Sequence, residues 1–200
     1  MMKVIKKFLE WLNIRPDEKQ RWILLSMAIS GLLITYSHPV LLKTIVSQLP
    51  TEWLAFEALV SSISALIIGS IWRGKLRNKA IKWFIYLAAT ESFCGFLLGM
   101  YLCFISFNVW VFAIASLIYT SLISMFVGKC IMYFKSQLWN EQKREIYDNN
   151  SSIVSGIVCV IGYIFALFAM PSLKIGLFLW GICCIIDDIG WIIVVKKYIR

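Results

Sequence analysis

Acidic side chains interrupt two apolar stretches of this 200-residue chain at matched positions. Glu91 lies eight residues inside the stretch 83–105, and Asp187 lies eight residues before the end of the stretch 175–195. At 1.5 Å per helical residue, each would lie about 12 Å below the same membrane surface. A carboxyl group at that depth is protonated, hydrogen-bonded or in contact with water, because an isolated charge there costs at least about 2.5–3.5 kcal/mol. Such groups suit a proton-coupled carrier, and the alternative is a structural acid that bonds a neighbouring helix.

Asp188 follows Asp187 directly and cannot point in the same direction. Successive residues of an α-helix are rotated by about 100°. We therefore expect one of the two to face a neighbouring helix and the other to face a cavity or a partner. We also expect the stretches that carry Glu91 and this pair to face one another, water or a partner chain, because a carboxylate facing lipid is untenable at this depth.

Other ionisable residues in apolar stretches complete the candidates for a substrate or proton pathway, which are His38, Glu57, Glu91, Asp187 and Asp188. His38 precedes Pro39, which removes a helical hydrogen bond and should bend the first apolar stretch in its outer half. A single histidine and six cysteines without a C-x-x-C pair predict no metal site. We expect no enzyme and no cofactor, because the chain has no nucleophile or phosphate-binding motif.

The composition decides which class of protein must position these groups. Apolar residues make up 60% of the chain and charged residues 16%, with a mean hydropathy of +0.78. Soluble domains have about 45–50% apolar and about 25% charged residues. The chain is therefore expected to be an integral membrane protein, with the lipid bilayer as its surroundings and no nucleic-acid partner despite its net charge of +9.

The apolar stretches predict an all-α polytopic membrane protein with six transmembrane helices, since about 20 apolar residues cross a bilayer. Long charged connections are expected at 73–82 and 135–150, and Gly95-x-x-x-Gly99 predicts a close packing surface between helices. The chain divides into an amphipathic cytoplasmic N-terminal helix and linker (1–21), a transmembrane domain (22–195) and a basic tail (196–200). The six expected spans are Trp22–Val46, Trp53–Trp72, Trp83–Ile105, Val109–Phe134, Ser151–Met170 and Ile175–Val195.

Lysine and arginine indicate the orientation, because they are retained on the cytoplasmic side. Of the 20 basic residues, all but Lys43 and Lys174 lie in segments that six spans would place on one side. Both termini are therefore expected to be cytoplasmic. The location expected for the chain is the cell membrane, which would be the cytoplasmic membrane of a bacterium.

The chain resembles the N-terminal six-helix half of a major facilitator superfamily transporter of the drug-exporter kind. Its first span ends in Tyr36-Ser37-His38-Pro39-Val40, as drug exporters of the family often do, and its second leads into Gly74-Lys75-Leu76-Arg77-Asn78-Lys79-Ala80-Ile81-Lys82. The family signature there is Gly-x-Leu-x-Asp-Arg-x-Gly-Arg. Glycine and leucine match and two lysines keep the positive charge, whereas an asparagine and an isoleucine replace the acid and the second glycine. The motif covers about residues 36–82, and the topology covers 22–200.

This resemblance implies a half bundle of three plus three helices, with Gly74, Leu76, Asn78, Lys79 and Lys82 as a gating loop. Family members have twelve helices in two halves around a central substrate. The function expected is proton-coupled transport of a small solute, such as a drug or another amphipathic compound, by a homodimer or by a heterodimer with a second half-transporter. The alternatives are a substrate-binding membrane component of an energy-coupling-factor importer, and an interaction or immunity protein that does not transport.

Overall fold

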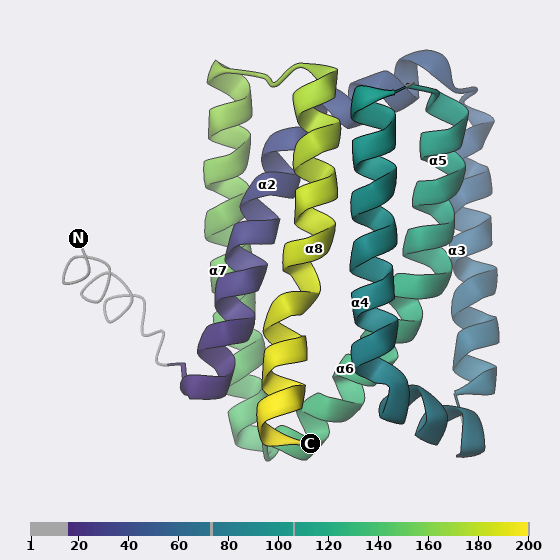
Figure 1. Ribbon diagram of the computed structural model, residues 1–200. Coiled ribbons are helices and arrows are strands. Elements are labelled where there is room, and N and C mark those ends of the chain that lie inside the picture. The colour runs from purple at the N-terminus through teal and green to yellow at the C-terminus, as the bar shows by residue number, and fades with distance from the viewer. Residues whose placement is uncertain (1–15, 73, 106, 200) are drawn as a thin grey trace.

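The fold is known from a computed structural model, which describes residues 16–72, 74–105 and 107–199. All of its regular structure is helical (Figure 1). Residues 1–15, which include most of the expected amphipathic N-terminal helix, lie outside the described residues. The α-helices are α2 (Glu18–Gln48), α3 (Glu52–Ile71), α4 (Gly74–Phe104), α5 (Val109–Ile118), α6 (Met125–Leu138), α7 (Glu141–Phe168) and α8 (Leu173–Tyr198), and a π-helix, η1 (Tyr119–Ser124), joins α5 to α6.

Five of these helices are long and apolar enough to cross a membrane, namely α2, α3, α4, α7 and α8. The helices α5, η1 and α6 follow one another without a gap and form one further continuous rod (Figure 1). The chain is therefore built as a helical membrane protein, as its composition predicts.

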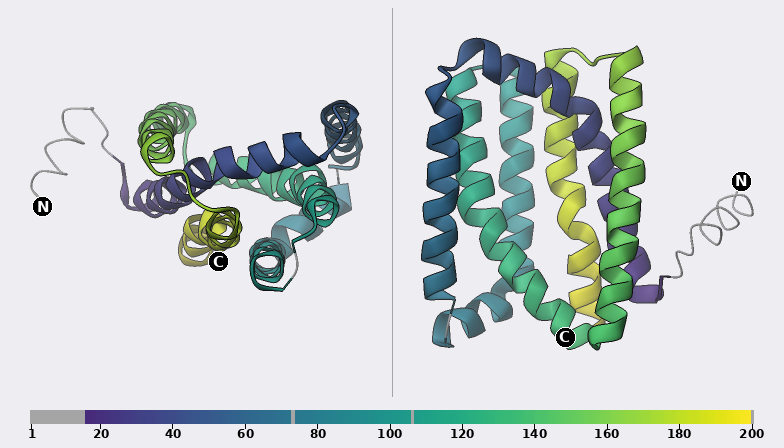
Figure 2. Two further views of the ribbon diagram at one scale, coloured as in Figure 1. Left: turned by 90° about the horizontal axis from the view of Figure 1, so that it is seen from above. Right: turned by 180° about the vertical axis from the view of Figure 1, so that it is seen from behind.

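The helices stand side by side in a bundle with α8 and α4 at the front, α2 behind α8, and α7 behind α2 (Figures 1 and 2). The helix α2 packs against α7 and α8, and α8 packs against α4. Behind them, the α5–η1–α6 rod crosses the bundle obliquely, and α3 lies at the far end against this rod (Figure 2). The helix α2 stays helical through Pro39, and its second part turns across one end of the bundle towards α3 (Figure 2).

Side-chain caps set several helix beginnings, because the first backbone N–H groups of a helix lack partners. The carboxylate of Asp17 accepts from Gln20 N at 2.7 Å, and the side-chain oxygen of Asn140 accepts from Lys143 N at 3.0 Å. The side chain of Asn108 accepts from the N–H groups of Trp110 and Val111. Asp17, Asn108 and Asn140 thereby begin α2, α5 and α7.

The prediction that residues 73–82 and 135–150 form long charged connections between helices is wrong. Helix α4 already begins at Gly74, and only residues 139 and 140 separate α6 from α7. Lysine, arginine, glutamate and glutamine are good helix formers, so the charged segments continue the helices beyond the apolar stretches. The expected spans therefore mark the apolar parts of longer helices.

Glycines let α8 approach α4 closely. A Cβ atom on Gly99 of α4 would lie 2.8 Å from the Cα atom of Gly181, and one on Gly95 would lie 2.8 Å from Cβ of Cys184. Neither glycine could carry a side chain without movement of α8. The close packing surface predicted from Gly95-x-x-x-Gly99 is confirmed, and its partner is α8.

Candidate functional site

Glu91 lies inside the bundle on the face of α4 that is turned towards α8 and the α5–η1–α6 rod. Its side chain is buried, with 4% of its surface exposed. Ser124 Oγ donates to Oε1 of Glu91 at 2.8 Å, and Tyr119 is a second polar neighbour of this carboxyl group. The second oxygen, Oε2, is buried without a hydrogen-bond partner among the described residues. Glu91 is therefore half-satisfied, which is costly away from water.

The π-helix η1 supplies both of these residues. Tyr119 is its first residue and Ser124 its last, so the wider turns of η1 span the level of Glu91. Ser121, in the middle of η1, is fully buried and exchanges a hydrogen bond of 2.9 Å with Ser61 of α3. Short π-helical segments inside α-helices are frequent at functional sites. Here η1 turns hydroxyl groups both to Glu91 and to α3.

The two aspartates of α8 face different neighbours. Asp188 is buried against α4, where Ser92 Oγ donates to its Oδ2 at 3.2 Å. Asp187 instead accepts from Ser30 Oγ of α2 at 2.9 Å, and its side chain is exposed. The two aspartates therefore bond to two different neighbouring helices, α2 and α4, and the expectation that one of them faces a cavity or a partner stays a prediction. Asp187 is the member of the pair that something from outside the chain can reach.

Glu91, Asp187 and Asp188 together form what we call the acid cluster. Each aspartate interacts electrostatically with Glu91, and they interact with each other. No lysine, arginine or histidine forms an ion pair with any of the three among the residues that the structure describes. The cluster therefore brings together three acid groups from α4 and α8 without a compensating cation.

The cluster exists because α4 and α8 approach each other so closely. Gly95, Gly99 and Gly181 lie one to three turns from the acids on the two facing surfaces. Cys184 fills the space beside Gly95 and contacts Tyr119, and the thiol of Cys183 donates to Ser30 O at 3.4 Å. Small side chains on both helices thus let the acids and their hydroxyl partners meet at one level.

The cluster does not hold a metal ion by its geometry. Within the described parts of the chain, no group of three His, Cys, Asp or Glu side chains is arranged to bind one.

No family model, no curated protein and no solved structure matches the chain. The acid cluster is therefore the basis on which the function is proposed.

The remaining sequence candidates lie away from the acid cluster. His38 is exposed on α2, with its ring edge-on to Tyr163 of α7 at 6.4 Å between centroids. Glu57 is half-buried on α3, which packs mainly against η1, α5 and α6. Of the expected gating loop, Asn78, Lys79 and Lys82 are exposed on the first turns of α4, and the side chains of Gly74 and Leu76 lie outside the described residues. The sequence candidates thus separate into one assembled group of three acids and several isolated positions.

The hydroxyl partners of the acids are residues of the site that the sequence did not point to. Ser30, Ser92 and Ser124 come from three different segments, and each donates to one acid of the cluster. Serine is common in apolar helices, where it usually bonds a carbonyl of its own helix. A pattern of spacing in the sequence could not distinguish these three from the other serines.

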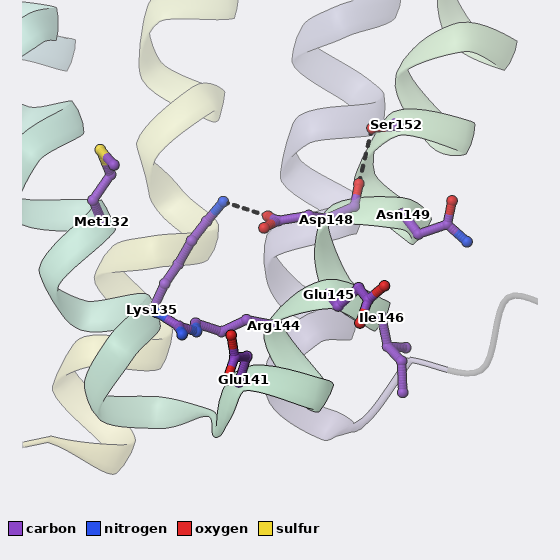
Figure 3. A pocket seen from close by; sticks show the side chains of 9 residues that line it. All are labelled: Met132, Lys135, Glu141, Arg144, Glu145, Ile146, Asp148, Asn149 and Ser152. Carbon is purple, nitrogen blue, oxygen red and sulfur yellow. Dashed lines mark hydrogen bonds and ion pairs between the residues drawn. The ribbon is translucent and has the colours of Figure 1, made fainter.

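A second polar region lies at the end of the bundle where α6 meets α7 (Figure 3). It is a hollow of about 870 Å³ in which Lys135 Nζ donates to Asp148 Oδ1 at 2.8 Å. Arg144, Glu141 and Glu145 also line it, so both signs of charge are mixed. Because positive and negative side chains are mixed around the hollow, it favours neither an anionic nor a cationic ligand. Its ion pair links α6 to α7 at the surface.

Next to that hollow, aromatic side chains join the ends of several helices. Trp139 stacks on Tyr147 at 4.9 Å between centroids and lies edge-on to Trp191 of α8. Its Nε1 donates to Asp17 Oδ2 at 3.0 Å, which fixes the beginning of α2. Lys197 of α8 donates to Glu18 at 2.7 Å in an exposed ion pair. Aromatic packing, a hydrogen bond and an ion pair thus hold this end of the bundle together.

Proposed function

We propose that the chain is a proton-coupled carrier of a small solute in the cell membrane, which would be the cytoplasmic membrane of a bacterium. The observation that carries the proposal is the acid cluster, with Glu91 half-satisfied, Asp188 buried and Asp187 accessible. Ionisable groups inside a membrane are expensive to place and typically line ion or substrate pathways. A proton that binds to the cluster and leaves it when water enters would couple the passage of a solute to the proton gradient.

The proposed architecture has six membrane crossings, with the α5–η1–α6 rod as the fourth. We number the crossings one to six along the chain. Each crossing then packs against the next in the order five, one, six, three, four, two. Exchanging one with four, two with five and three with six reverses this order and leaves the neighbours unchanged. Such an internal repeat supports a half bundle of three plus three helices like that of major facilitator transporters.

A single half bundle encloses a substrate only with a second half. We therefore propose that the chain works as a homodimer or with a separate half-transporter. The helices α3 and α7, at opposite ends of the bundle, support this proposal because few of their residues are buried within the chain. Each can accept another helix without displacing a neighbour.

The orientation proposed places both termini in the cytoplasm. The beginnings of α2, α4 and α7 and the ends of α6 and α8 lie at one end of the bundle, and these segments carry 11 of the 20 basic residues (Figure 1). Lys43 and Lys174 belong to the other end, near the connections from α2 to α3 and from α7 to α8. This asymmetry supports retention of the basic end on the cytoplasmic side.

Cysteine labelling tests this orientation. A membrane-impermeant maleimide added to intact cells is expected to label Thr51→Cys, an exposed position between α2 and α3, and to leave Gln142→Cys unlabelled until the membrane is permeabilised. The unsubstituted chain gives the background from its six cysteines. The opposite pattern for the two variants would contradict the proposed orientation.

Proton movement tests the carrier function. The purified chain would be placed in liposomes that contain a pH indicator, and neutral, cationic and anionic amphipathic compounds would be added one at a time. We expect at least one class to move protons across liposomes with the wild-type chain, and we expect Glu91→Gln to lose this movement while the matched variant Glu57→Gln, outside the cluster, retains it. Proton movement no greater than in protein-free liposomes, or equal in wild type and Glu91→Gln, would show that the proposal is wrong.

A further inference from the structure

A hollow of about 570 Å³ lies between α3 and the α5–η1 part of the rod, and no residue of the acid cluster lines it. Its walls are mostly apolar, and Phe56, Ile114 and Ile118 at its rim are each about half exposed. In a chain that crosses the bilayer as proposed above, these side chains meet lipid, so the hollow opens to the hydrocarbon of the membrane. Sites for small molecules commonly have about 300–1,000 Å³ and apolar walls with a few polar groups.

One polar group of this hollow is the hydroxyl group of Ser64. Ser64 lines the hollow, and only 4% of its surface is exposed. Its Oγ forms no hydrogen bond with any described residue, although serine in an apolar helix usually bonds a carbonyl of its own helix. Ser62 has that usual bond, since its Oγ donates to Ala58 O at 2.8 Å. A buried hydroxyl group that donates to no described residue is costly, so Ser64 favours a ligand that accepts a hydrogen bond.

A second hydroxyl group in the hollow belongs to Ser121 of η1. It is fully buried and shares a hydrogen bond of 2.9 Å with Ser61 of α3. A bond between two hydroxyl groups uses only one of their two protons. When Ser61 is the donor, the proton of Ser121 is available to a ligand. The described residues that line the hollow thus offer two hydroxyl donors, Ser64 and Ser121, and none of these lining residues is charged.

The hollow follows α3, with the hydroxyl groups at one end and aromatic rings at the other. Trp53 and Phe56 line the aromatic end, with ring centroids 5.6 Å apart. Phe56 precedes Ser64 by eight residues, which is about 12 Å along the helix axis. Twelve residues of α3 precede Ser64 and seven follow it, so the hydroxyl end lies near the middle of this membrane crossing. A fitting ligand therefore has its polar group near the middle of the bilayer and an apolar part beside the aromatic rings.

We propose that this hollow is a binding site for a lipid-soluble quinone of the membrane. A quinone ring is neutral, and its carbonyl oxygens accept hydrogen bonds from Ser64 and Ser121, while its apolar tail packs against Trp53 and Phe56. A phospholipid does not match, because its charged head group cannot lie near the middle of the bilayer. A hydrocarbon chain alone leaves both hydroxyl donors without an acceptor. The inference rests on the proposed membrane location and is independent of proton-coupled transport.

Equilibrium dialysis of the purified full-length chain in detergent micelles tests this inference, with duroquinone as the probe and protein-free micelles as the reference. The four methyl groups of duroquinone block the ring carbons to which cysteine thiols would add. We expect saturable binding to the wild type, about three- to tenfold weaker binding to Ser64→Ala because one hydrogen bond is lost, and unchanged binding to the matched control Ser62→Ala. Ser64→Ala removes a hydroxyl group that bonds no described residue, so we expect it to fold like the wild type.

Durene, which has the same ring and methyl groups without the carbonyl oxygens, is the matched ligand. We expect durene to bind the wild type more weakly than duroquinone does, and to bind the wild type and Ser64→Ala equally. Three results would each overturn the inference: no saturable binding of duroquinone, equal binding of duroquinone by the wild type and Ser64→Ala, or equal binding of the two compounds by the wild type.

The source of the ligand is tested with chains purified in the same detergent from membranes that contain quinones. Solvent extracts of the wild type and of Ser62→Ala are expected to contain more quinone per chain than extracts of Ser64→Ala. Equal quinone content in the wild type and Ser64→Ala, including none in either, would overturn the inference. Binding of duroquinone without any proton movement in liposomes would refute only the carrier proposal, and proton movement without binding of duroquinone would refute only the quinone site.

Discussion

Gly99→Leu is expected to prevent the chain from folding. A Cβ atom at this position would lie 2.8 Å from Gly181 Cα, 3.1 Å from Gly181 N and 3.1 Å from Leu177 O. All three are backbone atoms of α8, so no rotation of a side chain can make room. Overpacking usually costs about 1–3 kcal/mol, and a contact between two backbones should reach the upper part of that range or exceed it. The helices would have to separate, which would also disassemble the acid cluster.

The effect of Gly99→Leu is measured by the yield of monodisperse protein in detergent and by its thermal unfolding. The matched control is Gly69→Leu on α3, since a Cβ atom there would have nothing within 4 Å. Both variants add the same side chain to an apolar helix, so only the packing differs. A Gly99→Leu chain that purifies and unfolds like the control would contradict the close contact between α4 and α8.

Glu91→Gln is expected to remove an exchangeable proton from the interior of the protein. The wild-type carboxyl group is buried, accepts one hydrogen bond at Oε1, and has no partner for Oε2 among the described residues. A proton on Oε2 is therefore the arrangement that avoids a bare charge. Glutamine keeps the shape and the bond to Ser124 but cannot titrate. The infrared carbonyl band of a protonated carboxyl group should therefore disappear or lose most of its intensity in Glu91→Gln.

The matched control for this measurement is Asp148→Asn, which removes an acid at the exposed end of the bundle. It should leave the carbonyl band unchanged. The band should also shift in heavy water, because the proton exchanges with solvent through the accessible side of the cluster. An unchanged band in Glu91→Gln would assign the proton to another group.

The sequence predicted the membrane class and the apolar parts of the helices because both depend on composition along the chain. It also predicted that Asp187 and Asp188 face different surroundings, because helical geometry fixes their relative rotation. The charged segments 74–82 and 141–150 were misjudged as connections, since charged residues end an apolar stretch without ending a helix. The length of an apolar stretch alone could not distinguish the end of that stretch from the end of the helix.

The partners within the acid cluster were beyond prediction for a different reason. Ser30 bonds Asp187 across 157 residues of sequence, Ser92 bonds Asp188 across 96, and Ser124 bonds Glu91 across 33. These pairs depend on which helices are neighbours, and apolar helices give little indication of their neighbours because most of their faces are equally apolar. The π-helix that brings Tyr119 and Ser124 to Glu91 is likewise without a signal in its residues, YTSLIS.

The proposal that the acid cluster binds and releases a proton is tested most directly by an infrared pH titration of the wild-type chain in lipid. Such a titration needs no knowledge of the solute. We expect the carbonyl band of a protonated carboxyl group to be present at low pH and to decline as the pH rises, with the declining band absent from Glu91→Gln and retained in Asp148→Asn. A band that does not change with pH in the wild type, or one that titrates identically in Glu91→Gln, would contradict the binding and release of a proton by the acid cluster.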